Sequence, residues 1–216
     1  MLENEQVIAH INEYPFKEAA EYCAIWLDEA LKKHNLSANQ ISSFISVAGP
    51  GGFSGVRTGT SMISGMSSVL DVPVKTLSSL EALALSLEHI DDHILLSCLN
   101  AKRNGVYLGA YRRVHDTLEH IFPEQLVQKS DLEEFYNHNL SDYTQVSLTG
   151  HGADIIKPFL NDMKILQDIE TSDAVRFGLR SHFIQGHRPH APIYLRAADA
   201  ALPKKKFEVP KISGIE

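Results

Sequence analysis

Residues 44–59 read Phe-Ile-Ser-Val-Ala-Gly-Pro-Gly-Gly-Phe-Ser-Gly-Val-Arg-Thr-Gly. The first five residues favour a short β-strand, and the glycines after them supply the backbone angles of a tight turn. From Gly55 to Leu70, bulky apolar residues recur on one side of a predicted helix, while Gly and Ser recur on the other. A strand, a glycine-rich turn and a helix in this order are typical of an α/β unit.

The same alternation continues on both sides of these residues. Before them, apolar residues from Phe16 to His34 recur at the spacing of one amphipathic helix stripe. After them, residues 74–77 favour a strand, and Ser78 with Glu81 forms a capping box that begins another helix. This order predicts an α/β sandwich with a largely parallel sheet.

The second half repeats the pattern with shorter elements. Strands at 93–99 and 106–113 are predicted to form a hairpin through the Asn104-Gly105 turn. The remaining predicted elements are strands at 118–122 and 146–148, a helix capped by Ser130, and helices at 153–160 and 172–184.

The composition excludes several classes of protein. Of the 216 residues, 44% are apolar, and no run approaches the roughly 18 uncharged apolar residues of a membrane span. The formal net charge of −7 opposes binding to phosphate backbones, so we expect no autonomous contact with nucleic acid. Cys23 and Cys98 are predicted to be buried, reduced thiols, which fits a cytoplasmic protein without a membrane partner.

Four segments resemble a known family. Residues 49–59, followed by Val-Pro-Val-Lys-Thr-Leu-Ser-Ser-Leu-Glu-Ala-Leu-Ala at 72–84, are similar to the signature block of the TsaB/YeaZ family. The sequence Asn-Ala-Lys-Arg-Asn-Gly-Val-Tyr at 100–107 resembles the hairpin of this family, and Pro-Ile-Tyr-Leu-Arg at 192–196 resembles its closing motif.

The resemblance implies an actin-like, ribonuclease-H-like ATPase fold of the α/β class with two lobes. We expect an N-terminal lobe at 1–98, a C-terminal lobe at 99–196 and a tail at 197–216. Members of the family open with a hydrophobic strand ending in Asp-Thr-Ser and a second strand after it. Residues 1–10 resemble only the later part of that second strand, so we expect the first strand of the N-terminal lobe to be missing.

The resemblance also bears on catalysis. The related catalytic subunit TsaD carries two metal-binding histidines, four positions apart, in the segment that here contains Ser79 and Leu83. Leucine offers no lone pair, and a serine hydroxyl is a poor ligand compared with imidazole. We therefore expect no metal site and no catalytic residue. His89 and His93 share the same spacing, but they lie where a helix gives way to a strand, and we interpret them as part of a hydrated turn.

The family implies a non-catalytic scaffold or activator in tRNA N6-threonylcarbamoyladenosine (t6A37) modification. It implies binding to the paralogue TsaD through the two amphipathic helices, engagement of the ATPase TsaE, a homodimer where TsaD is absent, and tRNA contact only through the complex. Periodicity alone favours packing of the first helix on the protein's own sheet. The predicted interface residues are Ala20, Cys23, Leu27, Val56, Gly59, Ile63 and Met66.

The alternative is an actin-fold ATPase or kinase whose glycine-rich turns at 49–55 and 150–152 cradle phosphates. Gly51, Gly52, Ser54 and Arg57 are the predicted anion or nucleotide contacts, although the Gly-Lys-Ser/Thr ending of a Walker loop is missing. Such an enzyme needs carboxylates for magnesium, and none occurs between Ile41 and Leu70. We expect the chain alone to bind no cofactor, with ATP or ADP bound weakly or only in the complex.

Overall fold

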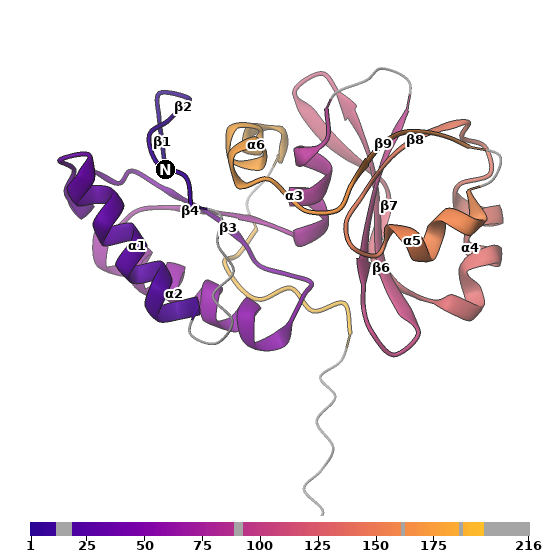
Figure 1. Cartoon of the computed structure of the whole chain (residues 1–216), viewed down its shortest axis with the longest axis horizontal. Helices are drawn as coiled ribbons and strands as arrows, with labels where there is room; N and C mark the ends of the chain where they lie inside the picture. Colours follow the sequence, from indigo (N-terminus) through magenta and orange to yellow (C-terminus); the bar gives the residue numbers. More distant parts are fainter. Residues whose placement is uncertain (12–18, 89–92, 161–162, 186–187, 197–216) are drawn as a thin grey trace, which may run out of the picture.

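The computed structural model describes residues 1–11, 19–88, 93–160, 163–185 and 188–196, with side chains of the first helix from Tyr22 onward (Figure 1). The helices are α1 (Ala19–Lys33), α2 (Phe53–Leu70), α3 (Ser79–Ser86), α4 (Leu132–Asn139), α5 (Ala153–Ile156) and α6 (Ala174–Leu179). The strands are β1 (Leu2–Glu3), β2 (Gln6–Val7), β3 (Phe44–Val47), β4 (Val74–Leu77), β5 (Ile94–Asn100), β6 (Gly105–Val114), β7 (Thr117–Gln128), β8 (Gln145–Thr149) and β9 (Lys164–Ile169).

The strands form three sheets. β1 and β2 make a small antiparallel hairpin, and β3 pairs with β4 in a parallel two-stranded sheet. The large sheet has the order β7-β6-β5-β8-β9, in which β7, β6 and β5 are antiparallel while β5, β8 and β9 are parallel. The prediction of a largely parallel sheet is therefore wrong for this half, because tight turns join β5 to β6 and β6 to β7 and so reverse the chain.

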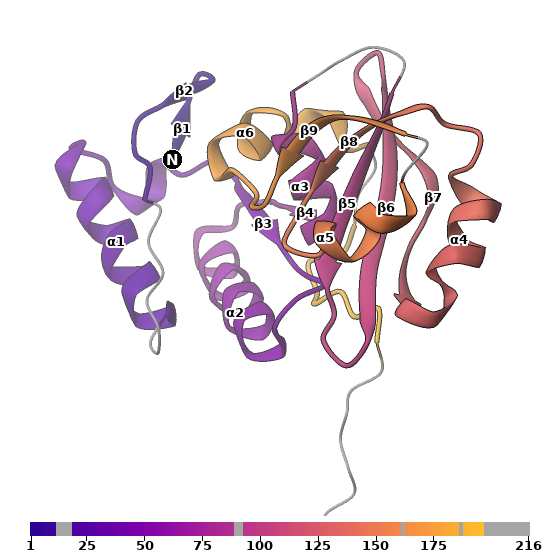
Figure 2. The same cartoon turned by 45° about the vertical axis from the view of Figure 1, so that its right-hand side comes forward.

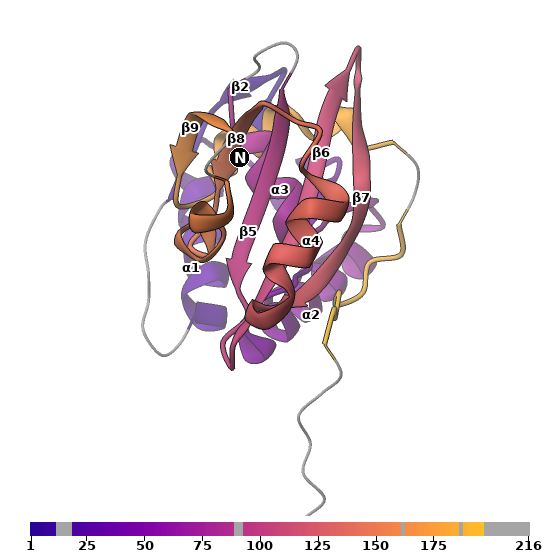
Figure 3. The ribbon, with the colours of Figure 1, turned by 90° about the vertical axis from the view of Figure 1, so that its right-hand side faces the viewer.

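Two apolar cores lie on opposite faces of the large sheet. Alternate residues of β5 supply them: Ile94, Leu96 and Cys98 face one core, and Leu95 faces the other. The first core is closed by side chains of α4 and α5, and the second by α3 and residues around α6. Figure 3 shows α4 lying across one face of the sheet with α3 behind it.

Local predictions met mixed outcomes. The capping box of α3 is confirmed, since Glu81 N donates to Ser78 Oγ over 2.9 Å and Ser78 N donates to Glu81 Oε2 over 2.6 Å. The Ser130 cap is wrong: Asp131 is the N-cap of α4, and the Ser130 hydroxyl donates to its carboxylate. Cys98 is buried as predicted, whereas Cys23 is exposed and the prediction for it is wrong, because α1 lies at one end of the molecule (Figure 2).

The two N-terminal helices, α1 and α2, bury few of their own residues. α1 and α2 lie side by side at one end of the molecule (Figure 2). Among residues whose burial is described, Leu31 is the one buried residue of α1 and Thr60 the one buried residue of α2. Neither this pair nor any other described helix is long and apolar enough to cross a membrane.

Residues 188–196, which we call the strap, run back across the molecule. Its hydrogen bonds join Arg188 to Glu81, His190 to Thr76 and to the carbonyl of Thr60, Ile193 N to the carbonyl of Ala48, Tyr194 to Arg57, and Arg196 to the carbonyl of Ala101. The strap therefore links α2, the β3–β4 sheet, α3 and the turn between β5 and β6.

Candidate docking face and cleft

The outer side of α1 and α2, which we call the docking face, presents apolar groups to solvent. Tyr22 and Ile25 of α1 are 42% and 50% exposed, and Val69 of α2 is 85% exposed. Such an unpartnered apolar surface on two adjacent helices is typical of a protein–protein contact.

The predicted interface residues fall on these two helices. Cys23 and Gly59 are exposed, and Leu27, Val56, Ile63 and Met66 are half-buried. Ala20 lies in α1, but its side chain falls outside the described residues. None of the described six is fully buried in the chain's own core.

The small-residue side of α2 also faces open space. A Cβ atom added at Gly55, Gly59 or Gly65 would meet no atom within 4 Å. Within the described part of the chain these glycines therefore serve no close packing, although each weakens the helix relative to alanine by roughly 0.5–1 kcal/mol. Small residues of this kind allow the backbone of a second helix to approach closely.

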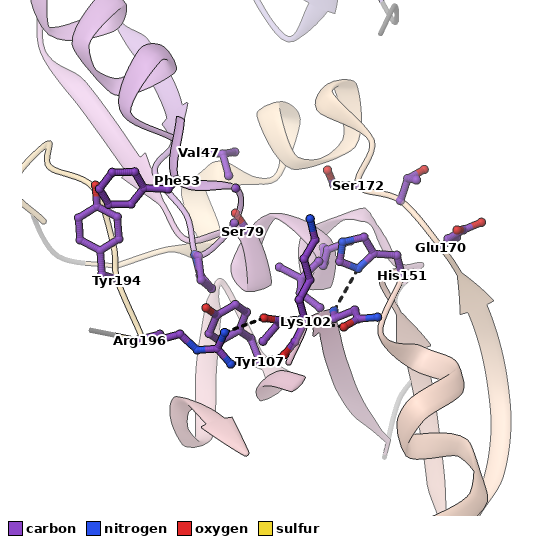
Figure 4. A pocket seen from close by; sticks show the side chains of 18 residues that line it. Val47, Phe53, Ser79, Lys102, Tyr107, His151, Glu170, Ser172, Tyr194 and Arg196 are labelled. Carbon is purple, nitrogen blue, oxygen red and sulfur yellow. Dashed lines mark hydrogen bonds between the residues drawn. The ribbon is translucent and has the colours of Figure 1, made fainter. Parts of the chain in front are cut away.

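A cleft of about 980 Å³ lies between the β3–β4 sheet and the C-terminal ends of β5 and β8, and Figure 4 shows the side chains that line it. Its described lining comes from the glycine-rich turn, α3, the β5–β6 turn, the β8–α5 turn, the end of β9 and the strap. The lining residues are Val47, Pro50, Gly51, Gly52, Phe53, Ser79, Leu83, Leu99, Asn100, Ala101, Lys102, Tyr107, His151, Glu170, Thr171, Ser172, Tyr194 and Arg196.

Only two of the four predicted anion contacts line the cleft. Gly51 and Gly52 line it, whereas Ser54 and Arg57 are not among its lining residues. The guanidinium of Arg57 lies 3.8 Å from the centre of the Phe53 ring, and its Nε donates to Tyr194 Oη over 2.9 Å. Lys102, Tyr194 and Arg196 were not predicted as cleft residues, and their place in the two family-like motifs was the available signal.

Ser79 and Leu83 both line the cleft, one helical turn apart on α3. Leu83 is 3% exposed, and the methyl groups of its side chain offer nothing to a metal ion. The pair of imidazoles expected of a TsaD-type metal site therefore has no counterpart at these two positions.

A separate polar cluster lies under the strap. Donor atoms of Glu81, His120 and Glu124 lie within 4.8 Å of one another, a set that could hold a divalent ion. The carboxylates are already engaged: both terminal guanidinium nitrogens of Arg188 donate to Glu81 over 2.8 Å, and the hydroxyls of Ser78 and Tyr111 donate to Glu124. The cluster is satisfied by protein donors and fastens the strap.

The environment shifts the two carboxyl groups in opposite directions. Burial alone raises the pKa of Glu81, but hydrogen bonds from His120, Arg188 and Ser78 N outweigh it and lower the pKa to about 2. Burial raises the pKa of Glu124 above its ordinary value, and the nearby charge of Glu81 adds to the rise. Glu81 is thus the ionised member that pairs with Arg188.

Comparison with known proteins identifies the family. A family model described as "TsaD: tRNA N6-adenosine threonylcarbamoyltransferase" matches residues 16–211. Two relatives are named "tRNA threonylcarbamoyladenosine biosynthesis protein TsaB". The Bacillus subtilis protein is 27% identical over 163 residues, 76% of this chain and 69% of the relative. The Haemophilus influenzae protein is 27% identical over 207 residues, 87% of this chain and 84% of the relative.

Two solved structures share the fold. YeaZ from Pseudomonas aeruginosa superposes with a TM-score of 0.61 at 16% identity, covering 83% of this chain and 86% of that chain. A protein "with similarity to peptidase YEAZ from Pseudomonas aeruginosa" gives 0.60 at 18% identity, covering 82% and 84%. The fold is accordingly the actin-like, ribonuclease-H-like α/β fold. The chain therefore belongs to the TsaD family, and its place there is among the TsaB/YeaZ proteins.

Proposed function

We propose that this protein is a non-catalytic scaffold or activator of tRNA t6A37 modification, and that it binds a TsaD-type paralogue through its docking face. The observation that carries the proposal is the open side of α2, where a Cβ atom added at Gly55, Gly59 or Gly65 would meet no atom of the described chain within 4 Å. Membership of a family named for threonylcarbamoyl transfer supports the pathway. The names of the two TsaB relatives, both biosynthesis proteins of tRNA threonylcarbamoyladenosine, support the same pathway and are compatible with an accessory role.

Two features of the cleft favour an accessory role over an enzyme. Ser79 and Leu83 occupy the positions at which TsaD-type metal ligands are expected, and Glu170 is the single acidic residue among the described lining. Magnesium-dependent phosphoryl transfer commonly needs more than one carboxylate or equivalent oxygen ligand. A calorimetric titration of the isolated chain with ATP and magnesium tests the ATPase alternative directly.

The remaining partners follow from the same proposal. The catalytic paralogue acts on tRNA, so this chain meets tRNA through the complex, in the cytoplasm, with the ATPase TsaE engaging the assembled pair. Where the paralogue is absent, the docking face of one copy covers that of a second copy. An interface of ordinary size, about 800 Å² per partner, suffices for a stable pair.

Gly59→Glu tests the docking face. The substitution places a charged side chain in open space on α2 and exchanges Gly for a better helix former, so the isolated fold is retained. We expect it to weaken binding to the TsaD-type paralogue by at least about a hundredfold, because the carboxylate would be buried without a partner. Isothermal titration calorimetry measures the affinity, and circular dichroism checks the fold.

Asn137→Glu is the matched control, since it adds the same charge to an exposed position of α4 on the large-sheet side. It should leave the affinity unchanged. Undiminished binding by a folded Gly59→Glu variant would refute the proposed face.

A further inference from the structure

Three segments that meet where the strap crosses the molecule contain no acidic residue. The chain has 27 Asp and Glu residues against 20 Lys and Arg. None of the acidic residues falls in residues 41–70, 93–115 or 188–196. These segments contain the glycine-rich turn with α2, the β5–β6 hairpin and the strap. The cations of these segments therefore have no acidic neighbour along the chain, although the protein as a whole is acidic.

The strap joins the start of α2 to the β5–β6 turn. Arg57, near the start of α2, donates from Nε to Tyr194 Oη over 2.9 Å. Two residues further along the strap, the guanidinium of Arg196 donates to the carbonyl of Ala101 over 3.0 Å. Arg103 is an exposed residue of the turn that follows Ala101. One short stretch of the strap thus connects the parts of the chain that carry Arg57 and Arg103.

Exposed aromatic rings accompany these arginines. Phe53 and Tyr194 stack with ring centres 5.4 Å apart, and they are 44% and 47% exposed. Figure 4 shows the two rings together at one side, apart from His151 and Glu170. The guanidinium of Arg57 lies 3.8 Å from the centre of the Phe53 ring. Arg57 and Tyr194 therefore cover part of Phe53 while remaining exposed themselves.

The Arg57 side chain is held in place but is not neutralised. Its Nε is bonded to Tyr194, whereas its two terminal nitrogens make no hydrogen bond or ion pair within the described chain. By contrast, Arg176 pairs with Glu88 over 2.6 Å. A guanidinium fixed by a ring and a hydrogen bond loses little freedom on binding, and its remaining N–H groups match the oxygens of a phosphate.

The chemistry of this surface fits RNA better than it fits a protein partner. Arginine beside exposed aromatic rings occurs in contacts of both kinds. RNA repeats its negative charge at every phosphate, and its unpaired bases stack on aromatic rings and on guanidinium planes. A surface that combines rings and arginines with three acid-free segments is complementary to both features.

We propose that Arg57, Arg103 and Tyr194, which we call the arginine patch, contact tRNA in the assembled complex. The two arginines bind phosphates, and Tyr194 stacks on an unpaired base. The inference rests on the proposed function, because a chain with a net charge of −7 holds RNA weakly alone and needs the paralogue beside it. Neither arginine lines the cleft, so the patch is a separate surface.

Fluorescence anisotropy with labelled tRNA, titrated with the complex of this chain and its TsaD-type paralogue, tests the patch. Arg57→Gln and Arg103→Gln should each weaken tRNA binding by at least about fivefold, since each removes a charged contact to a phosphate. Each should also lower the slope of log affinity against log salt by about 0.7–0.9. Tyr194→Leu, which removes the ring but keeps an apolar side chain, should weaken binding by about tenfold.

Arg112→Gln is the matched control. Arg112 is also exposed, and its guanidinium carbon lies 6.0 Å from the centre of the Tyr143 ring, but its cross-strand neighbour is Glu119. This variant should bind tRNA as the wild type does.

Unchanged tRNA affinity in both Arg57→Gln and Arg103→Gln overturns the patch. Weaker binding of these two variants to the paralogue in calorimetry also overturns it, because the patch would then be a protein contact. A wild-type chain that fails to bind the paralogue refutes the docking face and this inference with it, so the two kinds of failure are distinguishable.

Discussion

At the scale of single residues, Glu81 serves three structural tasks at once. Its carboxylate accepts from Ser78 N at the start of α3, pairs with both terminal nitrogens of Arg188, and lies 3.5 Å from His120 Nε2. The capping box was predictable from Ser78 and Glu81 three positions apart. The pairing with Arg188 was not, because 107 residues separate the partners and local spacing carries no information about them.

The Glu81 carboxylate makes the stability of the protein depend on pH in the acid range. The pKa of Glu81 in the folded protein, about 2, lies below the ordinary value of 4.5. The ionised carboxylate therefore adds its full contribution to the free energy of unfolding above pH 4.5, and this contribution is lost as the pH falls toward 2. Glu81→Gln should therefore be less stable than wild type at pH 7, and the difference should shrink between about pH 4.5 and 2. Urea unfolding at a series of pH values measures it.

Glu170→Gln, at an exposed carboxylate, is the control for that series. A constant difference between wild type and Glu81→Gln across the whole acid range would contradict the assignment of Glu81 as the ionised partner of Arg188.

At the scale of elements, long periodic segments were predictable and short exposed ones were not. The predicted strand 74–77 has the observed bounds, and α2 begins two residues before the predicted Gly55. β9 escaped prediction because Lys164–Ile169 is an edge strand with no buried residue, so it has no strict alternation to detect. The helix predicted at 172–184 is only α6 and a short 3-10 turn at Ser181–Phe183. α6 begins two residues later than predicted, at Ala174, because Asp173 caps it by accepting from the amides of Val175 and Arg176.

Substitution by alanine should change the stability of the protein in opposite directions at two glycines, one in a helix and one in a turn. Gly65 of α2 has open space around it, so Gly65→Ala should stabilise the isolated chain by about 0.5–1 kcal/mol. Gly150 has positive φ and no room, so Gly150→Ala should cost at least about 1–3 kcal/mol. Urea midpoints compare the two, and a loss of stability in Gly65→Ala would show that this side of α2 is packed in solution.

At the scale of the whole molecule, the cleft is what the sequence could not reveal. Its lining combines residues near 50, 80, 100, 151, 170 and 195, and only the folded chain brings them together. Charge follows the same logic. The net charge of the whole chain, −7, does not predict the local charge of either part: the cleft lining contains Lys102 and Arg196, and the single charged residue of α2 is Arg57.

The neutrality of α2 predicts how docking responds to salt. Because Arg57 is hydrogen-bonded to Tyr194 and no other charge lies on α2, we expect burial of apolar surface on this helix to drive the proposed contact. We expect the dissociation constant for the TsaD-type paralogue to change by less than about threefold between 50 and 500 mM sodium chloride, a range over which screened charge pairs weaken strongly. Calorimetry at several salt concentrations measures this, and a steep loss of affinity would point to an ionic interface instead.

The strap affects the order in which the contacts of the protein form during its synthesis. Arg57 and Tyr194 are 137 positions apart, and His190 lies 130 positions beyond Thr60. These bonds cannot form until nearly the whole described chain has been translated, whereas the hairpins of the large sheet can close as soon as they emerge. The bonds between the strap and α2 are thus among the last to form, so the proposed docking face is complete only when synthesis of the chain is almost finished.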